Sequence, residues 1–473
     1  MKTEERLEEQ TPENVLSLGK SIPETIIRLS IPSIIEQFLI CLATLADTAM
    51  VGSIGAAATA SIAITTSTVW LINGIITALS VGASYLVSHA IGEGDRDKTE
   101  SSVRQSIMAS VLVGLCINFF VLCIYRPLPG WLGAETAIIP DAQVYLKIIG
   151  FGLVPQALGV VLSAILRSAG NTKLPLYCNL GSNLLNVIGN FFLIYPSRRI
   201  PLPGAYSVGL PMWGAGLGIK GAALATTGSR YILALVLLYH IVNTKTAARI
   251  SVSGNYRFRR ETVRSLVRIS IPVMLERNTL CLGQIALTAM ISGLGTVPLA
   301  AHYLTNQTEG LLYLPAYGFA YTATTLIGQA LGAHNKDLAN QFAKDICIIS
   351  TIVILLACVP VFLLAGPIID LFTNDAGVLH LGTMTLKIAA ATEIFFSFFI
   401  VASGIFRGSG DVKFTLLVSL TGMWGFRVGL VWIVVNVLHW GVVGVWIAIA
   451  FDCFIRTLLC IRRLISGKWM RIQ

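Results

Sequence analysis

The sequence predicts an all-α membrane protein whose twelve transmembrane helices form two six-helix bundles related by a parallel internal repeat. Three observations support this fold class: few charged residues, a series of long apolar segments, and a match between the two halves of the chain. Hydrophobic residues make up 55% of the 473 residues and charged residues only 12%, whereas soluble domains carry about 25% charged residues. Most of the surface is therefore expected to contact lipid.

The long apolar segments set the number of helices. A hydrocarbon layer about 30 Å thick requires about 20 apolar residues of α-helix. The segments are continuous, unlike the alternating strands of roughly ten residues that form a membrane β-barrel. We expect transmembrane helices at 29–52, 60–88, 103–125, 143–166, 174–195, 216–242, 266–292, 303–330, 345–372, 383–405, 414–437 and 441–464.

The segments between these helices divide the chain into lobes and tails. The polar N-terminus lacks the apolar core of a signal peptide, so we expect the first helix to remain in the mature protein. The expected divisions are an N-terminal tail at 1–28, an N-lobe at 29–242, a basic linker at 243–265, a C-lobe at 266–464 and a C-terminal tail at 465–473.

Basic residues indicate how the chain lies in the membrane. Of the 34 lysines and arginines, 25 fall on the side that holds both tails and the linker. Because cytoplasmic loops carry an excess of Lys and Arg, both termini are predicted to be cytoplasmic, in a multi-pass protein of the cell membrane. Topology and contact with anionic membrane lipid account for the net charge of +10, so we expect no nucleic-acid partner.

The two lobes repeat each other at an offset of 240 residues. Arg28–Pro32 (RLSIP) recurs as Arg268–Pro272 (RISIP), and Glu36 matches Glu276. Each lobe has an even number of helices, so both enter the membrane in the same direction. Parallel repeats of this kind are typical of secondary transporters, in which one bundle rocks against the other around a central cavity.

Four short motifs, in their order along the chain, resemble the multidrug and toxic compound extrusion (MATE) family. They are Leu45–Gly52 (LADTAMVG), Leu166–Lys173 (LRSAGNTK), Leu294–His302 (LGTVPLAAH) and Phe406–Lys413 (FRGSGDVK). The chain is similar to the NorM-like bacterial multidrug efflux pumps of that family. This resemblance implies two six-helix lobes around a V-shaped cavity. It also implies antiport, with cationic or amphipathic small molecules exported in exchange for inward Na⁺ or H⁺.

Asp47 is the first candidate for coupling transport to an ion. It lies in an apolar segment with no basic residue within a helical turn, and its repeat partner is Leu287. Ionisable residues inside a span are costly and usually mark a pathway. The alternative is an aspartate that bonds to a neighbouring helix and serves only packing. The resemblance places Asp47 at the N-lobe cation site of the family.

Asn186 and Asn190 are predicted to join Asp47 at this site. They lie one turn apart and so share a helix face, and their amide oxygens can ligate Na⁺ or accept a bond from a protonated carboxyl group. In some branches of the family the second position is Asp, whereas here it is Asn190. The alternative is that both asparagines hold helices together, as Asn often does in membranes.

Glu36 and Glu276 are expected to be structural because they recur in both lobes. Each lies one turn after a proline, Pro32 or Pro272, so each is a candidate to bond the backbone groups that the proline leaves free. Gln37 is a further polar residue inside a span.

A second cation or substrate site is predicted in the C-lobe. In the pumps that the chain resembles, acids on the seventh and tenth helices contribute to such a site. Glu276 and Glu393 lie on these helices, about one turn earlier than that pattern, and Glu309 on the eighth helix is a third candidate. Arg230, Arg427 and Asp452 are further intramembrane charges, which we expect to pair with opposite charges or to reach the membrane interface.

Other functional classes receive less support. No P-loop or HExxH motif occurs, so we expect no enzyme, no cofactor and no metal site other than Na⁺ at Asp47. A lipid-linked saccharide flippase of related architecture would place a basic cluster inside the cavity, whereas the spans hold at least as many acids as bases. A membrane-embedded enzyme or receptor would need a polar catalytic cluster or a large external domain. We expect the transporter to act as a monomer.

Overall fold

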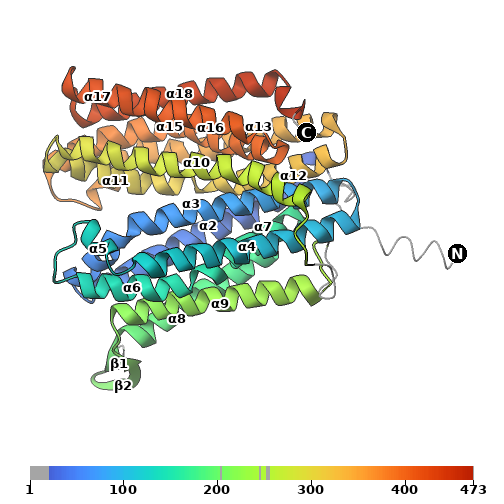
Figure 1. The fold of residues 1–473 in the computed structure, drawn as a ribbon. Helices are drawn as coiled ribbons and strands as arrows, with labels where there is room; N and C mark the ends of the chain where they lie inside the picture. Colours follow the sequence, from blue (N-terminus) through green and yellow to red (C-terminus); the bar gives the residue numbers. More distant parts are fainter. Residues whose placement is uncertain (1–20, 203–204, 244–246, 252–255, 472–473) are drawn as a thin grey trace.

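The computed structural model describes residues 21–202, 205–243, 247–251 and 256–471. Part of the predicted N-terminal tail, parts of the predicted linker and the end of the predicted C-terminal tail lie outside these residues. In Figure 1 the helices of the first half, from blue to green, form one bundle, and the helices of the second half, from yellow to red, form another bundle beside it.

The N-lobe contains seven long or interrupted helical segments and one short helix among its described residues. They are α2 (Ile22–Gly52), α3 (Ala56–Gly92), α4 (Arg96–Ile124), α5 (Leu128–Trp131), α6 (Ile139–Phe151), α7 (Leu153–Ser168), α8 (Lys173–Ile194) and α9 (Ile219–Asn243). Helices α6 and α7 meet at a bend of 48° and together make one span.

The C-lobe repeats this order. Its described helices are α10 (Arg260–Ser292), α11 (Thr296–Leu312), α12 (Leu314–Gly332), α13 (Lys336–Leu363), α14 (Ala365–Asp370), α15 (Ala376–Ser409), α16 (Val412–Leu420), α17 (Gly429–Asn436) and α18 (Gly441–Ile465). A π-helical segment, Thr421–Val428, joins α16 to α17, and a 3₁₀ turn, Lys468–Arg471, follows α18.

The described helices support the predicted fold class. Eight of them are long and apolar enough to cross a membrane, and the bent pair α6–α7 makes a ninth. Helix α8, helix α10 and the pair α11–α12 complete twelve rods, six in each lobe. The pair α11–α12 is interrupted at Tyr313, just before Pro315, because proline cannot donate a helical backbone hydrogen bond.

The structure differs from the predicted spans in two respects. Several helices are longer than the apolar segment within them: α2 begins at Ile22, and α10 begins at Arg260, inside the stretch predicted as linker. Strands β1 (Pro196–Leu202) and β2 (Ala205–Ala215) form an antiparallel hairpin between α8 and α9, with Ile200 opposite Leu210. Apolar length alone does not predict this hairpin, although the Pro-Gly pair in its sequence is a turn signal.

The two ends of the helical bundles differ. We call the end with the β1–β2 hairpin the hairpin end and the opposite end, where α2 begins and α18 finishes, the basic end (Figure 1). At the basic end the lobes touch through backbone. A Cβ atom added at Gly92 would lie 2.1 Å from the carbonyl oxygen of Gln329, and one added at Gly332 would lie 2.3 Å from that of His89. The lobes are therefore closed against each other at the basic end.

Candidate ion-coupling site and central cavity

Asp47 lies in α2, close to the hairpin end, and its only hydrogen bond to a side chain among the described residues comes from an amide. The Nδ2 atom of Asn190 in α8 donates to Asp47 Oδ1 at 2.5 Å. Arg230 in α9 is near enough to interact electrostatically with Asp47, but the two form no ion pair in the part of the chain that the structure describes. The negative charge of Asp47 therefore has no permanent ionic partner.

The structure brings Asn186 and Asn190 to the same place. Asn190 Nδ2 is also 3.5 Å from Asn186 Oδ1, and Asn186 Nδ2 donates to Thr226 Oγ1 of α9 at 3.1 Å. Asn190 Oδ1 is buried and has no hydrogen-bond partner among the residues that the structure describes. A buried acceptor without a donor is costly and requires an explanation. A cation or an added proton beside Asp47 would provide one.

The oxygen atoms of this cluster fit a hard cation. Na⁺ is such a cation, and hard cations prefer carboxylate, amide and hydroxyl oxygens. Asp47, Asn186 and Asn190 supply carboxylate and amide oxygens, and Asn190 Oδ1 receives no hydrogen bond from the described residues. The same cluster can accept a proton on Asp47, because no guanidinium group is bonded to that carboxylate.

Sequence reasoning did not connect Arg230 and Tyr145 to this cluster. Both interact electrostatically with Asp47, and Arg230 Nη1 is buried with no hydrogen-bond partner in the described part of the chain. The signal in the sequence was an arginine in the middle of a span, which usually faces a polar interior. Arg230 lies in α9, which follows the hairpin. The offset of 240 residues between the lobes therefore did not indicate which residue Arg230 would approach.

Glu36 and Glu276 form matching ion pairs. Arg167 Nη1 donates to Glu36 Oε1 at 3.0 Å, and Arg407 Nη2 donates to Glu276 Oε1 at 2.9 Å. Each pair joins the first helix of a lobe to the end of its fourth span. The partners are thus arginines rather than the backbone groups near the prolines. A cation bound at Glu276 would have to compete with Arg407.

Glu309 and Glu393 lie near each other in the C-lobe. Glu393 in α15 is fully buried and accepts a hydrogen bond from Ser397 Oγ at 2.5 Å, while its Oε2 atom has no partner. Glu309 in α11 interacts electrostatically with both Glu393 and Arg427. The structure therefore brings two of the three predicted C-lobe acids together and holds the third, Glu276, in an ion pair.

A network of buried charged residues lies close to Glu309. Arg427 Nε donates to Asp452 Oδ2 at 2.7 Å, and Arg456 Nε donates to Asp452 Oδ1 at 2.7 Å. This confirms the expected pairing of Arg427 with an acid. Arg427 belongs to the π-helical segment, and π-helical turns are frequent at functional sites.

A central cavity of about 270 Å³ lies between the lobes. Its lining combines polar and aromatic side chains from α2, α3, α10 and α12. These are Gln37, Trp70, Asn73, Gly74, Thr77, Arg277, Tyr317 and Tyr321.

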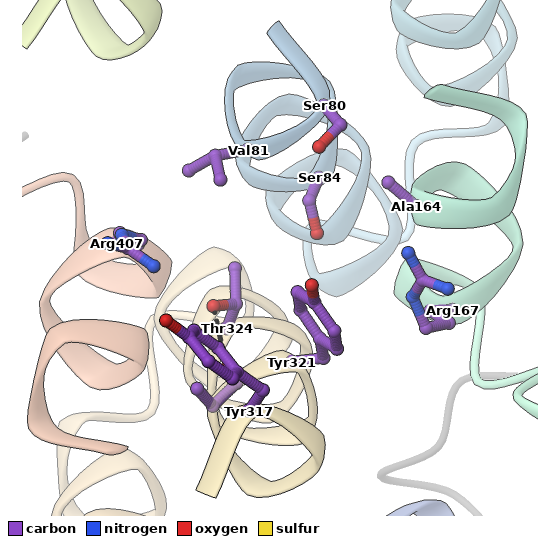
Figure 2. A pocket seen from close by; sticks show the side chains of 10 residues that line it. Ser80, Val81, Ser84, Ala164, Arg167, Tyr317, Tyr321, Thr324 and Arg407 are labelled. Atoms are coloured by element: carbon purple, nitrogen blue, oxygen red, sulfur yellow. Dashed lines mark hydrogen bonds between the residues drawn. The ribbon is translucent and has the colours of Figure 1, made fainter. Parts of the chain in front are cut away.

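A much smaller pocket of about 20 Å³ also borders Tyr317 and Tyr321. Figure 2 shows Arg167 and Arg407 on opposite sides of this pocket. The two tyrosines thus line both spaces, whereas Arg167 and Arg407 line the smaller one.

The comparisons with known proteins identify the family of this transporter-like arrangement. The MatE family model matches residues 32–192 and again residues 272–433, one match in each lobe. The chain belongs to the MatE family. This family consists of multidrug efflux transporters, not enzymes, and its members are ion-coupled antiporters.

Relatives of this MatE protein are similar to it along nearly their whole length. A probable multidrug resistance protein NorM from Thermotoga maritima is 25% identical over 460 residues, covering 95% of this chain and 93% of the relative. An uncharacterized transporter, YisQ, from Bacillus subtilis is 26% identical over 443 residues, covering 94% of each chain.

Solved structures agree with the MatE fold. A MOP superfamily transporter from Pyrococcus furiosus has a TM-score of 0.86 at 22% identity, with 98% of each chain covered. An outward-facing multidrug resistance MATE family transporter has a TM-score of 0.85 at 23% identity, also with 98% of each chain covered. The predicted fold and family are therefore confirmed, as a multi-pass membrane protein of twelve spans.

Proposed function

We propose that this MatE transporter is a secondary active antiporter that exports cationic or amphipathic small molecules in exchange for inward Na⁺ or H⁺. One observation carries this proposal: Asp47 Oδ1 is held at 2.5 Å by an uncharged amide beside the unpartnered Asn190 Oδ1. Such a carboxylate can be neutralised by an ion that arrives and leaves. Asp47, Asn186 and Asn190 are the residues that would hold this ion.

Helix α2 links this site to the lobe interface. Asp47 lies in its outer part, whereas its inner part packs against α12 of the other lobe. Ser30 Oγ donates to Thr322 Oγ1 at 3.0 Å, and a Cβ atom added at Gly318 would lie 2.4 Å from Ile34 Cγ1. A change in the bonding of Asp47 to α8 would therefore act on a helix that touches both lobes.

In this structure the two lobes are in contact at the basic end. We propose that the basic end faces the cytoplasm, because cytoplasmic loops are rich in Lys and Arg, and that both termini lie there. The contacts of Gly92 and Gly332 across the lobes close this side. Rocking of the lobes, with separation of these contacts, would then open the cavity to the cytoplasm. We propose that a single chain, as a monomer, completes this cycle in the cell membrane.

The C-lobe acids supply a second candidate site. Glu309, Glu393 and Asp452 are three carboxyl groups, whereas Arg427 and Arg456 are two guanidinium groups of the same buried region. With every group ionised, one negative charge lacks a counterpart. Buried charges are rarely tolerated without a partner, so we propose that Glu309 and Glu393 together hold one proton, one Na⁺ or a cationic group of the cargo.

The flippase alternative predicts a cluster of free basic groups in the cavity. Arg167 and Arg407 are each paired with a glutamate. Among the described residues, Arg277 is the only charged one that lines the central cavity. A single guanidinium group is not the cluster that a pyrophosphate would require, so the exporter is the better supported function.

Transport by purified protein in liposomes tests the proposal. An inward Na⁺ gradient and an inward H⁺ gradient are imposed separately, and the export of a fluorescent amphipathic dye is followed. We expect one of the two gradients to drive export by the wild type and neither to drive export by Asp47→Asn. Gradient-driven export by Asp47→Asn at the wild-type rate, at equal reconstitution, would overturn the proposed coupling role.

A further inference from the structure

Arg277 lines the cavity, and no carboxylate of the described residues forms an ion pair with it. Its Nη1 atom donates to Tyr317 Oη at 3.3 Å, and its guanidinium carbon lies 5.4 Å from the centre of the Tyr317 ring. Its Nε atom is buried and has no hydrogen-bond partner. Arg277 forms no ion pair within the described part of the chain.

The neighbouring acid does not neutralise Arg277 by direct contact. Glu276 precedes it in α10, but the two carboxylate oxygens of Glu276 accept hydrogen bonds from Arg407 Nη2 at 2.9 Å and from Thr415 Oγ1 at 3.1 Å. The side chain of Glu276 is therefore committed to other groups. The charge of Arg277 remains available to a molecule in the cavity.

The rest of the lining offers hydrogen-bond donors and aromatic faces. Asn73 Oδ1 accepts a bond from Gln156 Nε2 at 2.6 Å, which leaves the Nδ2 group of Asn73 to donate elsewhere. Trp70 is 57% exposed, so its ring can contact a ligand. No carboxylate occurs among the described residues that line the cavity.

We infer that the central cavity binds an amphipathic molecule that carries a carboxylate group, and that Arg277 is the residue that binds this group. The planar guanidinium matches a carboxylate with two parallel hydrogen bonds, and Trp70 and Tyr317 offer rings for the apolar part of the ligand. This inference rests on the proposed function only in taking the cavity as the cargo site. Among the amphipathic compounds of the proposed function, it selects anionic or zwitterionic cargo over purely cationic cargo.

Three dyes that share one ring and differ in the charge of one substituent test this inference. They share one coumarin ring and carry a 3-carboxylate, the neutral 3-carboxamide or a quaternary ammonium group attached through the amide. Their affinity for the purified full-length protein is measured by fluorescence polarisation, without any ion gradient. We expect the wild type to bind the carboxylate dye about tenfold or more tightly than the carboxamide dye, because hydrogen bonds to charged groups are the stronger ones.

Variants at Arg277 separate recognition from packing. Arg277→Gln should weaken binding of the carboxylate dye about tenfold or more and should strengthen binding of the quaternary ammonium dye. Arg277→Lys should restore part of the affinity for the carboxylate dye, since it keeps the charge but not the planar fork. The matched control is Arg126→Gln: Arg126 is exposed and also bonds a tyrosine, Tyr125, at 3.1 Å, but lies outside the cavity.

Two outcomes would overturn the inference. If Arg277→Gln weakens all three dyes equally, Arg277 supports Tyr317 and the lobe interface instead of binding an anion. If the wild type prefers the quaternary ammonium dye, the cavity selects cations. Failure of the proposed antiport is distinguishable, because it would appear as an absence of gradient-driven flux while the binding preference that depends on Arg277 remains. Asp47→Asn should likewise lose flux and keep that preference.

Discussion

In the N-lobe, the carboxylate of Asp47 lies at the outer part of α2 and is bonded by the amide of Asn190. At the equivalent position of the C-lobe, Leu287 is fully buried in an apolar cluster. The acids of the C-lobe, Glu309 and Glu393, instead lie on α11 and α15. The two lobes thus have equivalent helices, but their unpaired carboxyl groups lie on helices that are not equivalent.

The ion-paired acids, in contrast, lie at equivalent positions of the two lobes. Glu36–Arg167 and Glu276–Arg407 occupy matching positions, at 3.0 Å and 2.9 Å. We therefore propose that the ion pairs that recur in both lobes serve the shared architecture, and that the unpaired acids found in one lobe serve coupling. The following variants break or sharpen this comparison, from the largest expected effect to the smallest.

Asp47→Asn should reduce gradient-driven export to the level of liposomes without protein. The substitution preserves the shape of the side chain but removes the charge that a cation or proton would neutralise. Flux is measured as described above, and thermal unfolding in detergent checks that the fold is intact. Leu287→Asn, at the equivalent position of the C-lobe, tests the comparison: it should lower stability because it buries a polar group, with flux per folded molecule maintained. Equal loss of flux per folded molecule in both variants would contradict it.

Arg167→Ala and Arg407→Ala should destabilise the protein to a similar degree. Each leaves a buried glutamate without its ionic partner, which costs about 3–5 kcal/mol. The melting temperature in detergent measures the effect. If one variant melts like the wild type while the other unfolds far earlier, the two ion pairs are not structural equivalents.

Glu393→Gln should lower gradient-driven export about tenfold or more, since a bond to a charged group is worth about 1.5–3 kcal/mol, with a smaller change in melting temperature than for the arginine variants. The reason is the unpartnered Oε2 atom of Glu393, because the amide of glutamine cannot take up a proton there and has no negative charge with which to attract Na⁺. Glu309→Gln is expected to act in the same direction, and the double variant should add little, since the two acids share one ion. Full export by the double variant would restrict coupling to the N-lobe.

Gly92→Ala should have the smallest effect, a loss of about 1–3 kcal/mol from overpacking. The added methyl group would meet the backbone of Gln329 at the closed basic end. Gly228→Ala is the matched control, because nothing lies within 4 Å of a Cβ atom at that position. Thermal unfolding and labelling of a cysteine placed in the cavity report stability and opening. Identical behaviour of the two variants would mean that the contact at Gly92 does not hold the lobes together.

The sequence predicted the architecture well because lipid imposes a simple length rule on apolar helices, and because the offset of 240 residues between Arg28 and Arg268 repeats the pattern. The grouping of Asp47, Asn186 and Asn190 followed from helix periodicity and the family resemblance. The partners of Glu36 and Glu276 did not, since Arg167 and Arg407 approach from distant helices. The cavity position of Arg277 was also missed, because packing between lobes, not local sequence, sets it.

Direct binding of the coupling ion to purified protein tests the central claim most directly. The number of Na⁺ ions or protons that exchange per chain is measured for the wild type, for Asp47→Asn and for Leu287→Asn. The account predicts that Asp47→Asn binds one ion fewer than the wild type, while Leu287→Asn binds the same number. An unchanged number of ions in Asp47→Asn would contradict the assignment of Asp47 as the residue that couples ion entry to export.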